Sequence, residues 1–358
     1  MLILLGLSIL PSIIKLFMGD VDGNKQKKKL FLILCGLLIV FVVGFRHVNV
    51  GTRDTETYWK MYENAMNSSS LKAFLTNHKV FETFFLFSEC LFSFFLWALA
   101  KIIPNPQILI FITSAFVTIS VLCFIFKHSK NTMLSVLMYI CLGAMTFNMN
   151  GMRQAVAIAI CLFAYGFAKD KKLIPFLLTV LIATLVHKSA IFFVVVYFVP
   201  YFKLNLKSCL FFALLVIAFI LLSDRLAVLF DSFTGEDYGE GESFSSGGYI
   251  TLLIYILTII FAFITAKNNK DDKSFSMALF ITILGCSLFF ARYISTQIYE
   301  RMSYYFFYGV ILLLPQSIET LKDKDKKVMI TIVSVLSILL FAYRLYGSVF
   351  QNFTFFWA

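Results

Sequence analysis

The sequence predicts an all-α polytopic integral membrane protein, formed by a single domain over residues 1–358, with about 11–13 transmembrane or re-entrant helices. Composition is the first reason, because 60% of the 358 residues are hydrophobic and only 14% are charged, whereas about a quarter of a soluble domain is charged. The second reason is that the apolar runs are long and continuous, unlike the alternating pattern of a membrane β-barrel. Within lipid such runs form helices, because a helix satisfies its own backbone hydrogen bonds.

The apolar runs define the expected helices in chain order. Several are shorter than the ~20 residues of a perpendicular crossing. Only His187 and Lys188 interrupt the stretch 173–202, which predicts either one long broken helix or two half-helices that meet at a re-entrant bend. The runs occupy residues 1–18, 30–45, 80–103, 107–126, 132–148, 152–168, 173–186, 188–202, 208–223, 249–266, 275–291, 302–318 and 328–347.

The charged loops indicate how the chain is oriented. The net charge is +11, but the lysines gather in short connections, as the positive-inside rule requires, so we expect no nucleic-acid partner. The outer loop 46–78 and the acidic outer loop 224–248 are expected to be extracytoplasmic. The loops expected in the cytoplasm are 24–29, 127–130, 169–172, 203–207, 267–273 and 322–327.

One part of this topology is inconsistent. Two complete crossings by 80–103 and 107–126 would place the lysine loop 127–130 on the outer side, together with 46–78. Either one of these two runs does not cross the membrane, or the charge rule fails at this loop.

Polar residues that interrupt the apolar pattern converge on the outer ends of the helices. Any one of them alone is typical of a residue anchored among lipid headgroups. Together they predict a binding site for a ligand with phosphate charge and sugar hydroxyls, because arginine binds phosphate, histidine transfers protons and aromatic rings stack on sugars. These residues are Arg46, Asp54, Tyr58, Trp59, Glu82, Arg153, Gln154, His187, Arg292, Gln297, Arg301, Tyr304 and Tyr305.

Other site chemistries have no motif in the chain. It lacks a Walker A loop, GxSxG, HExxH and the Rossmann glycine pattern. The seven cysteines form no CxxC pair and no cysteine–histidine cluster, so we expect neither a disulfide nor a metal site. The pairs Asp20–Asp22 and Asp323–Asp325 lie in or beside lysine-rich loops and are expected to be solvated.

Five short motifs stand in order along the chain: FR…VGTRDTETY (45–58), Glu82 at the start of the third apolar run, NGMRQAVAIAI (150–160), HKSA (187–190) and ERMSYYF (300–306). In this order they resemble the EpsG family of bacterial exopolysaccharide and capsule proteins, which are Wzy-like polysaccharide polymerases. The resemblance covers nearly the whole chain. It departs at one point: the family pattern has an aspartate directly after Gly-Thr, whereas here Arg53 stands between Gly-Thr and Asp54.

The resemblance implies an enzyme that transfers a growing glycan from undecaprenyl diphosphate to a sugar hydroxyl of the next lipid-linked repeat unit, at the outer face of the bacterial cytoplasmic membrane. No cofactor and no metal is expected. Arg153 and Arg301, and in second rank Arg46 and Arg292, would bind the diphosphate. Asp54, Glu82 or His187 would accept the proton. The expected sugar-binding residues are Tyr58, Trp59, Gln154, Gln297, Tyr304 and Tyr305.

The expected partners are the lipid-linked oligosaccharide, the bilayer, and the flippase and chain-length regulator of the same pathway. Three alternatives remain at this point. The protein is a flippase for the same lipid-linked unit, another membrane glycan transferase such as an O-antigen ligase or a sugar acyltransferase, or a non-catalytic assembly factor. A flippase needs polar cavity groups that are reachable from both faces and often has internal repeats, and we find no repeat in this sequence.

Overall fold

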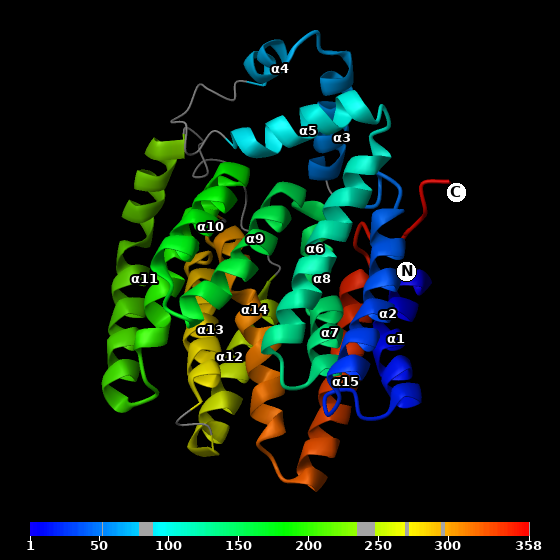
Figure 1. Cartoon of the computed structure of the whole chain (residues 1–358). Coiled ribbons are helices and arrows are strands. Elements are labelled where there is room, and N and C mark those ends of the chain that lie inside the picture. The colour runs from blue at the N-terminus through cyan, green and yellow to red at the C-terminus, as the bar shows by residue number, and fades with distance from the viewer. Residues whose placement is uncertain (52, 79–88, 235–247, 269–271, 295–297, 358) are drawn as a thin grey trace.

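The predicted all-α multi-pass fold is confirmed by a computed structural model (Figure 1). The structure describes residues 1–51, 53–78, 89–234, 248–268, 272–294 and 298–357. Among these residues there is no sheet, and the β-structure is limited to one isolated bridge between Arg46 and Phe355.

The helices follow the apolar runs closely. The elements are α1 (Leu2–Met18), α2 (Lys25–Gly44), α3 (Arg53–Asn67), α4 (Leu71–Asn77), α5 (Cys90–Ile102), α6 (Gln107–His128), α7 (Thr132–Cys141), α8 (Ala144–Asn150), α9 (Met152–Lys169), α10 (Leu173–Val186), the 3₁₀ helix η2 (Lys188–Tyr201), α11 (Leu206–Thr234), α12 (Tyr249–Thr265), the short 3₁₀ helix η3 (Ala266–Asn268), α13 (Lys273–Ala291), α14 (Ile298–Glu319) and α15 (Asp323–Leu345).

Within the described residues, five helices are long and apolar enough to cross a membrane, or six if the bent pair α7–α8 forms one crossing. Shorter apolar helices, among them α1, α10 and α12, lie in the same bundle. Helix α11 continues to Thr234, well into the segment 224–248 that the sequence predicts as a loop. Residues 235–247 of that loop lie outside the described residues.

The inconsistency in the topology has a structural answer. Helix α5, which is the described part of the run 80–103, lies across one end of the bundle together with α3 and α4, whereas α6 runs along the bundle (Figure 1). One crossing therefore separates 46–78 from the lysine loop 127–130, and the charge rule holds at that loop.

The segment 173–202 forms two packed elements. Helix α10 ends at His187, where φ is −151° and ψ is 120°, and η2 begins at the next residue and packs against α10. A 3₁₀ helix of 14 residues is uncommonly long, since such runs seldom exceed about four residues. This arrangement places His187 at a break between two helices, with its backbone in an extended conformation.

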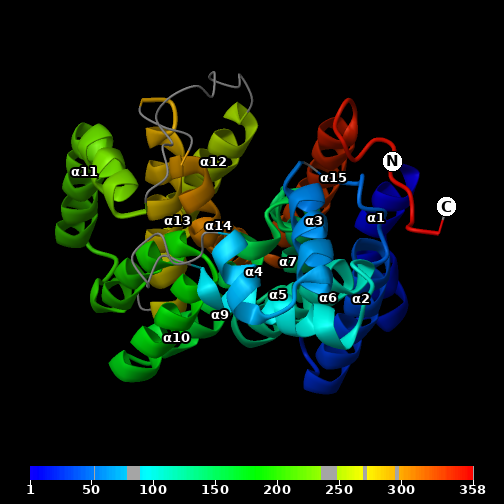
Figure 2. The ribbon, with the colours of Figure 1, turned by 90° about the horizontal axis from the view of Figure 1, so that it is seen from above.

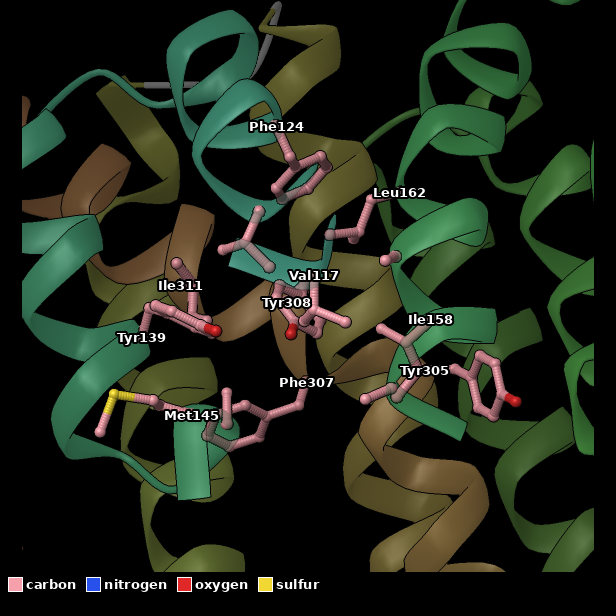
Figure 3. Close-up of a cluster of buried hydrophobic side chains, with 14 of the residues drawn as sticks. Val117, Phe124, Tyr139, Met145, Ile158, Leu162, Tyr305, Phe307, Tyr308 and Ile311 are labelled. Carbon is pink, nitrogen blue, oxygen red and sulfur yellow. The ribbon is translucent and has the colours of Figure 1, made fainter. Parts of the chain in front are cut away.

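The core of the bundle lies between α6, α7, α9 and α14 (Figure 3). Val117, Tyr139, Ile158 and Ile311 meet there, and each is at most 3% exposed. Each buried aliphatic or aromatic side chain of this size stabilises soluble folds by about 1.5–3 kcal/mol. In a bilayer, close packing between the helices is the main contribution instead, because lipid tails are as apolar as the core.

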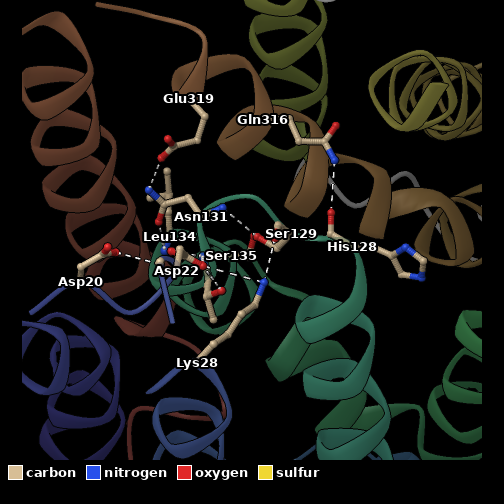
Figure 4. Close-up of polar contacts among 12 residues, drawn as sticks. Asp20, Asp22, Lys28, His128, Ser129, Asn131, Leu134, Ser135, Gln316 and Glu319 are labelled. Carbon is tan, nitrogen blue, oxygen red and sulfur yellow. Dashed lines mark hydrogen bonds and ion pairs between the residues drawn. The ribbon is translucent and has the colours of Figure 1, made fainter. Parts of the chain in front are cut away.

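Polar contacts join the segments around the lysine loops 24–29 and 127–130 to the end of α14, at one end of the bundle (Figure 4). Asp22 accepts hydrogen bonds from the backbone and the hydroxyl of Thr132 and pairs with Lys28 at 3.8 Å. It therefore joins the loop after α1 to the start of α7, which corrects the expectation that this aspartate is only solvated. Asn131 donates to Glu319 at 2.8 Å, which ties the loop after α6 to the end of α14. The positive-inside rule predicts that this end faces the cytoplasm.

Candidate functional site

A polar cavity of about 820 Å³ lies at the opposite end of the bundle. Helices α9, α10, α12, α14 and α15 contribute to it the terminus that lies away from their lysine loops, which explains why distant parts of the chain meet there. Helix α9, for example, contributes Arg153 from its first turn and ends at Lys169. The lining residues are Asp54, Tyr58, Glu89, Gly143, Thr146, Phe147, Asn150, Gly151, Arg153, Gln154, His187, Gly248, Ile250, Thr251, Glu300, Arg301, Tyr304 and Arg344.

Glu89 is the centre of an ionic cluster on one side of the cavity. One of its carboxylate oxygens contacts Nη1 of Arg153, and the other contacts Nδ1 of His187. The backbone amide of Lys188 also donates to this carboxylate, at 3.4 Å. The Glu89 side chain is only 9% exposed, so both oxygens are bound within the protein.

Charge keeps Glu89 ionised in spite of its burial. Burial by itself would raise the pKa of the Glu89 carboxyl, but the charges of Arg153 and His187 outweigh burial and lower this pKa below its usual range. An ionised carboxylate can only accept hydrogen bonds. When the His187 imidazole is neutral, its proton is therefore on Nδ1, and Nε2 is the nitrogen that can accept a proton.

The sequence did not identify Glu89. It predicted Glu82 as the carboxylate of this apolar run, and Glu82 lies outside the described residues. Glu89 immediately precedes α5, and its φ of 52° is unusual for a residue that is not glycine. A single acid between Phe87 and Leu91 in an apolar run is itself a sign of function in a membrane protein, and that sign could have drawn attention to Glu89.

Arg153 is held by Glu89 and by Tyr58. Besides the ion pair with Glu89, its Nε donates to the hydroxyl of Tyr58 at 3.2 Å, and its guanidinium carbon lies 5.3 Å from the centre of the Tyr58 ring. Tyr58 comes from α3 and is 6% exposed. The segment 46–78 thus contains a helix, α3, which places Tyr58 against Arg153. Asp54, one turn earlier, is exposed and also lines the cavity.

Arg301 and Tyr304 line the other side of the cavity, on the first turns of α14. The Arg301 side chain is exposed, and none of the described residues forms a hydrogen bond or an ion pair with its guanidinium within the structure. Gln154 donates to the Arg301 backbone carbonyl at 2.6 Å and so connects α9 to the start of α14. The ring of Tyr304 stacks on Phe147 with centroids 3.7 Å apart.

Arg344 is a cavity residue that the sequence reasoning missed. Its Nη1 donates to the Leu142 carbonyl at 2.6 Å, and its Nη2 donates to Thr251 Oγ1 at 3.0 Å. Leu142 and Gly143 form the break between α7 and α8, which are bent by 47°. Gly143 has a φ of 105°, and a Cβ there would lie 2.7 Å from the Arg344 guanidinium, so only glycine fits. A lone arginine near the end of an apolar run was the available signal.

Four predicted residues are not part of the cavity lining. Arg46 is fully buried and donates to the carbonyls of Val43 and Met149, each at 2.7 Å. It therefore ties the end of α2 to the end of α8. Arg292 is 4% exposed and pairs with Glu300 at 2.5 Å.

Trp59 and Tyr305 are the other two. Trp59 donates to Glu63 at 2.8 Å, and the Tyr305 hydroxyl accepts from Ser189 at 3.1 Å. Gln297 lies outside the described residues. Within the described part of the chain, no group of three or more potential metal ligands comes together, and all seven cysteines are free.

The fold and the cavity define a class: a multi-pass helical membrane protein that gathers arginines, carboxylates and a histidine in one cavity at one end. The chain belongs to the EpsG family, whose model matches residues 29–356. It is therefore a membrane protein of exopolysaccharide biosynthesis. Searches of curated proteins and of solved structures gave no match to this chain.

Proposed function

We propose that this protein polymerises lipid-linked oligosaccharide repeat units and that the glycan is transferred in the polar cavity. The observation that carries the proposal is the combination, in one cavity, of three arginines with a carboxylate–histidine pair. The cavity volume of about 820 Å³ is in the range of ~300–1,000 Å³ that is typical of ligand sites. That size suits a diphosphate with its adjoining sugars, while the polyprenyl chain stays in the bilayer.

The reaction is a glycosyl transfer. The oxygen of the acceptor hydroxyl attacks the anomeric carbon of the growing glycan, and the bond from that carbon to the diphosphate oxygen breaks. The hydroxyl proton passes to a base, and undecaprenyl diphosphate leaves with one additional negative charge. The donor is already activated by its diphosphate, so the step requires no nucleotide.

The arginines would stabilise the charge that grows on the leaving diphosphate. Arg301 and Arg344 are the strongest candidates, because Arg301 is exposed to the cavity and Arg344 donates to two neutral groups, the Leu142 carbonyl and the Thr251 hydroxyl. Arg153 would act next to them, with Glu89 fixing its position. Arg46 would act indirectly, because its guanidinium binds the backbone that leads into α9.

His187 is our candidate for the base. Glu89 orients the imidazole and favours the tautomer whose Nε2 can accept the hydroxyl proton, as carboxylates do for catalytic histidines elsewhere. Asp54 is the other described candidate, because it is exposed and lines the same cavity. Tyr58 and Tyr304 would contact the sugars through their rings.

The decisive experiment is polymer formation by the purified protein in proteoliposomes supplied with the lipid-linked repeat unit. His187→Gln should lower the transfer rate by about 10²–10⁴-fold, the usual contribution of a general base. Asp54→Asn should retain most activity if His187 is the base. Glu56→Gln is the matched control, since Glu56 is exposed on the same turn of α3 and does not line the cavity.

Two results would contradict the proposal. Wild-type transfer by His187→Gln together with loss in Asp54→Asn would move the base to Asp54. No polymer from the wild-type protein, combined with lipid-linked units that accumulate on the cytoplasmic side in cells lacking it, would identify a flippase instead. A polymerase defect leaves single repeat units on the outer side.

A further inference from the structure

A second cavity, of about 610 Å³, lies at the lysine-loop end between α2 and α6, far along both helices from the polar cavity. The two helices pack against each other at one edge of the bundle (Figures 1 and 2). The walls of this cavity are apolar. Three of its side chains, Ile33, Leu37 and Ile119, are 47%, 65% and 58% exposed. The groove between α2 and α6 is thus open to the surrounding lipid.

Three lysines close one end of this groove and no acid lines it. Lys25 and Lys29, four residues apart on α2, lie on one face of that helix, and Lys127 is in the last turn of the antiparallel α6. All three are exposed, and no described carboxylate forms an ion pair with them. Two neighbouring lysines differ, since Lys28 pairs with Asp22 and Lys130 pairs with Asp272.

The position of Lys25, in the first turn of α2, is unfavourable unless an anion joins it. The N-terminus of a helix carries a partial positive charge, which destabilises lysines and favours anions. The first turn of α2 contains lysines and no acid. A phosphate between Lys25, Lys29 and Lys127 would offset both the helix dipole and the repulsion among the three ammonium groups.

The length of the groove matches a glycerophospholipid. From Lys29 to Val40 the apolar wall extends 11 residues along α2, or about 16 Å at ~1.5 Å per residue. One leaflet contributes about half of the ~30 Å hydrocarbon core. The absence of a side chain at Gly36 lets the floor come close to α6, because a Cβ there would lie 2.8 Å from Cδ1 of Leu122.

We propose that this groove binds an anionic glycerophospholipid of the cytoplasmic leaflet, with its phosphate held by Lys25, Lys29 and Lys127 and an acyl chain lying along α2 and α6. Charge complementarity identifies the lipid class, and the leaflet follows from the lysine end of the bundle. The site is separate from the polar cavity and does not depend on the reaction proposed there.

The test measures how much dibrominated phosphatidylglycerol or phosphatidylcholine quenches a tryptophan placed in the groove by Ile119→Trp. Ile119 faces lipid, so this change leaves the core intact. Each lysine beside an anionic headgroup contributes about fivefold to affinity. The Lys25→Gln, Lys29→Gln, Lys127→Gln triple variant should therefore lower the preference for phosphatidylglycerol by at least about tenfold.

The control triple variant carries Lys322→Gln, Lys324→Gln and Lys327→Gln, which removes the same charge from exposed lysines at the same end of the bundle. It should keep the preference. An equal loss in the control variant would show bulk attraction to an anionic surface and overturn the site. Equal quenching by both lipids, or full competition by soluble glycerol phosphate, would also overturn it.

Discussion

Replacing Glu89 by glutamine should show how strongly the ionic cluster supports the polar cavity. The substitution keeps the shape of the side chain but removes the charge between Arg153 and His187. Breaking a fully buried ion pair by removing one partner costs about 3–5 kcal/mol. The Arg153 side chain is 29% exposed, so water recovers part of this loss. We expect the free energy of unfolding to fall by about 2–3 kcal/mol.

The measurement is denaturant unfolding of the purified protein in detergent micelles. Glu63→Gln is the matched control, because Glu63 is an exposed acid on α3 that accepts one hydrogen bond from Trp59. It should change the free energy of unfolding by less than about 0.5 kcal/mol. The double variant Glu89→Gln, Arg153→Gln should be more stable than the sum of its parts predicts, by at least about 1.5 kcal/mol.

The pH dependence gives a second check. The pKa of Glu89 is lowered in the folded protein, so its charge stabilises the fold at every pH above the usual glutamate range. This stabilisation is lost only as the pH falls through the lowered pKa. The difference between the wild type and Glu89→Gln should therefore be constant near neutral pH and shrink in acid. A difference that is absent at pH 7, or a coupling energy near zero, would refute the role assigned to Glu89.

Three other substitutions test the remaining parts of the site. Arg301→Lys should slow glycan transfer by about one to two decades, since a charge-assisted contact contributes about 1.5–3 kcal/mol. Arg225→Lys, at an exposed arginine, is its control, and equal transfer rates in the two variants would show that Arg301 does not bind the diphosphate. Gly143→Ala should lower thermal stability, because a left-handed residue with a side chain costs about 1–2 kcal/mol, whereas Gly166→Ala, with open space around it, should not. Arg46→Lys should lower thermal stability by leaving buried carbonyls without donors. Unchanged stability together with loss of glycan transfer would instead indicate that Arg46 binds the diphosphate.

The helices were largely determined by the sequence. Hydrophobic runs of the length of a bilayer specify helices wherever they occur, because in lipid a backbone has no other way to satisfy its polar groups. The boundaries of α6, α9 and α13 therefore lie within a few residues of the apolar runs. The alternation of lysine loops also determined which helix ends meet, and so it predicted that Arg153, His187 and Arg301 share one end.

The roles of individual side chains were decided by the tertiary structure. Arg46 and Arg301 are equivalent in the sequence as arginines at helix ends, but one is fully buried among carbonyls and the other is exposed to the cavity. Glu89 acquires its role from α9 and from the break at His187, which are far away in the chain. Arg344 depends on the bend at Gly143. Local pattern specifies helices because their bonds are local, whereas a partner across the bundle is fixed only when the helices pack.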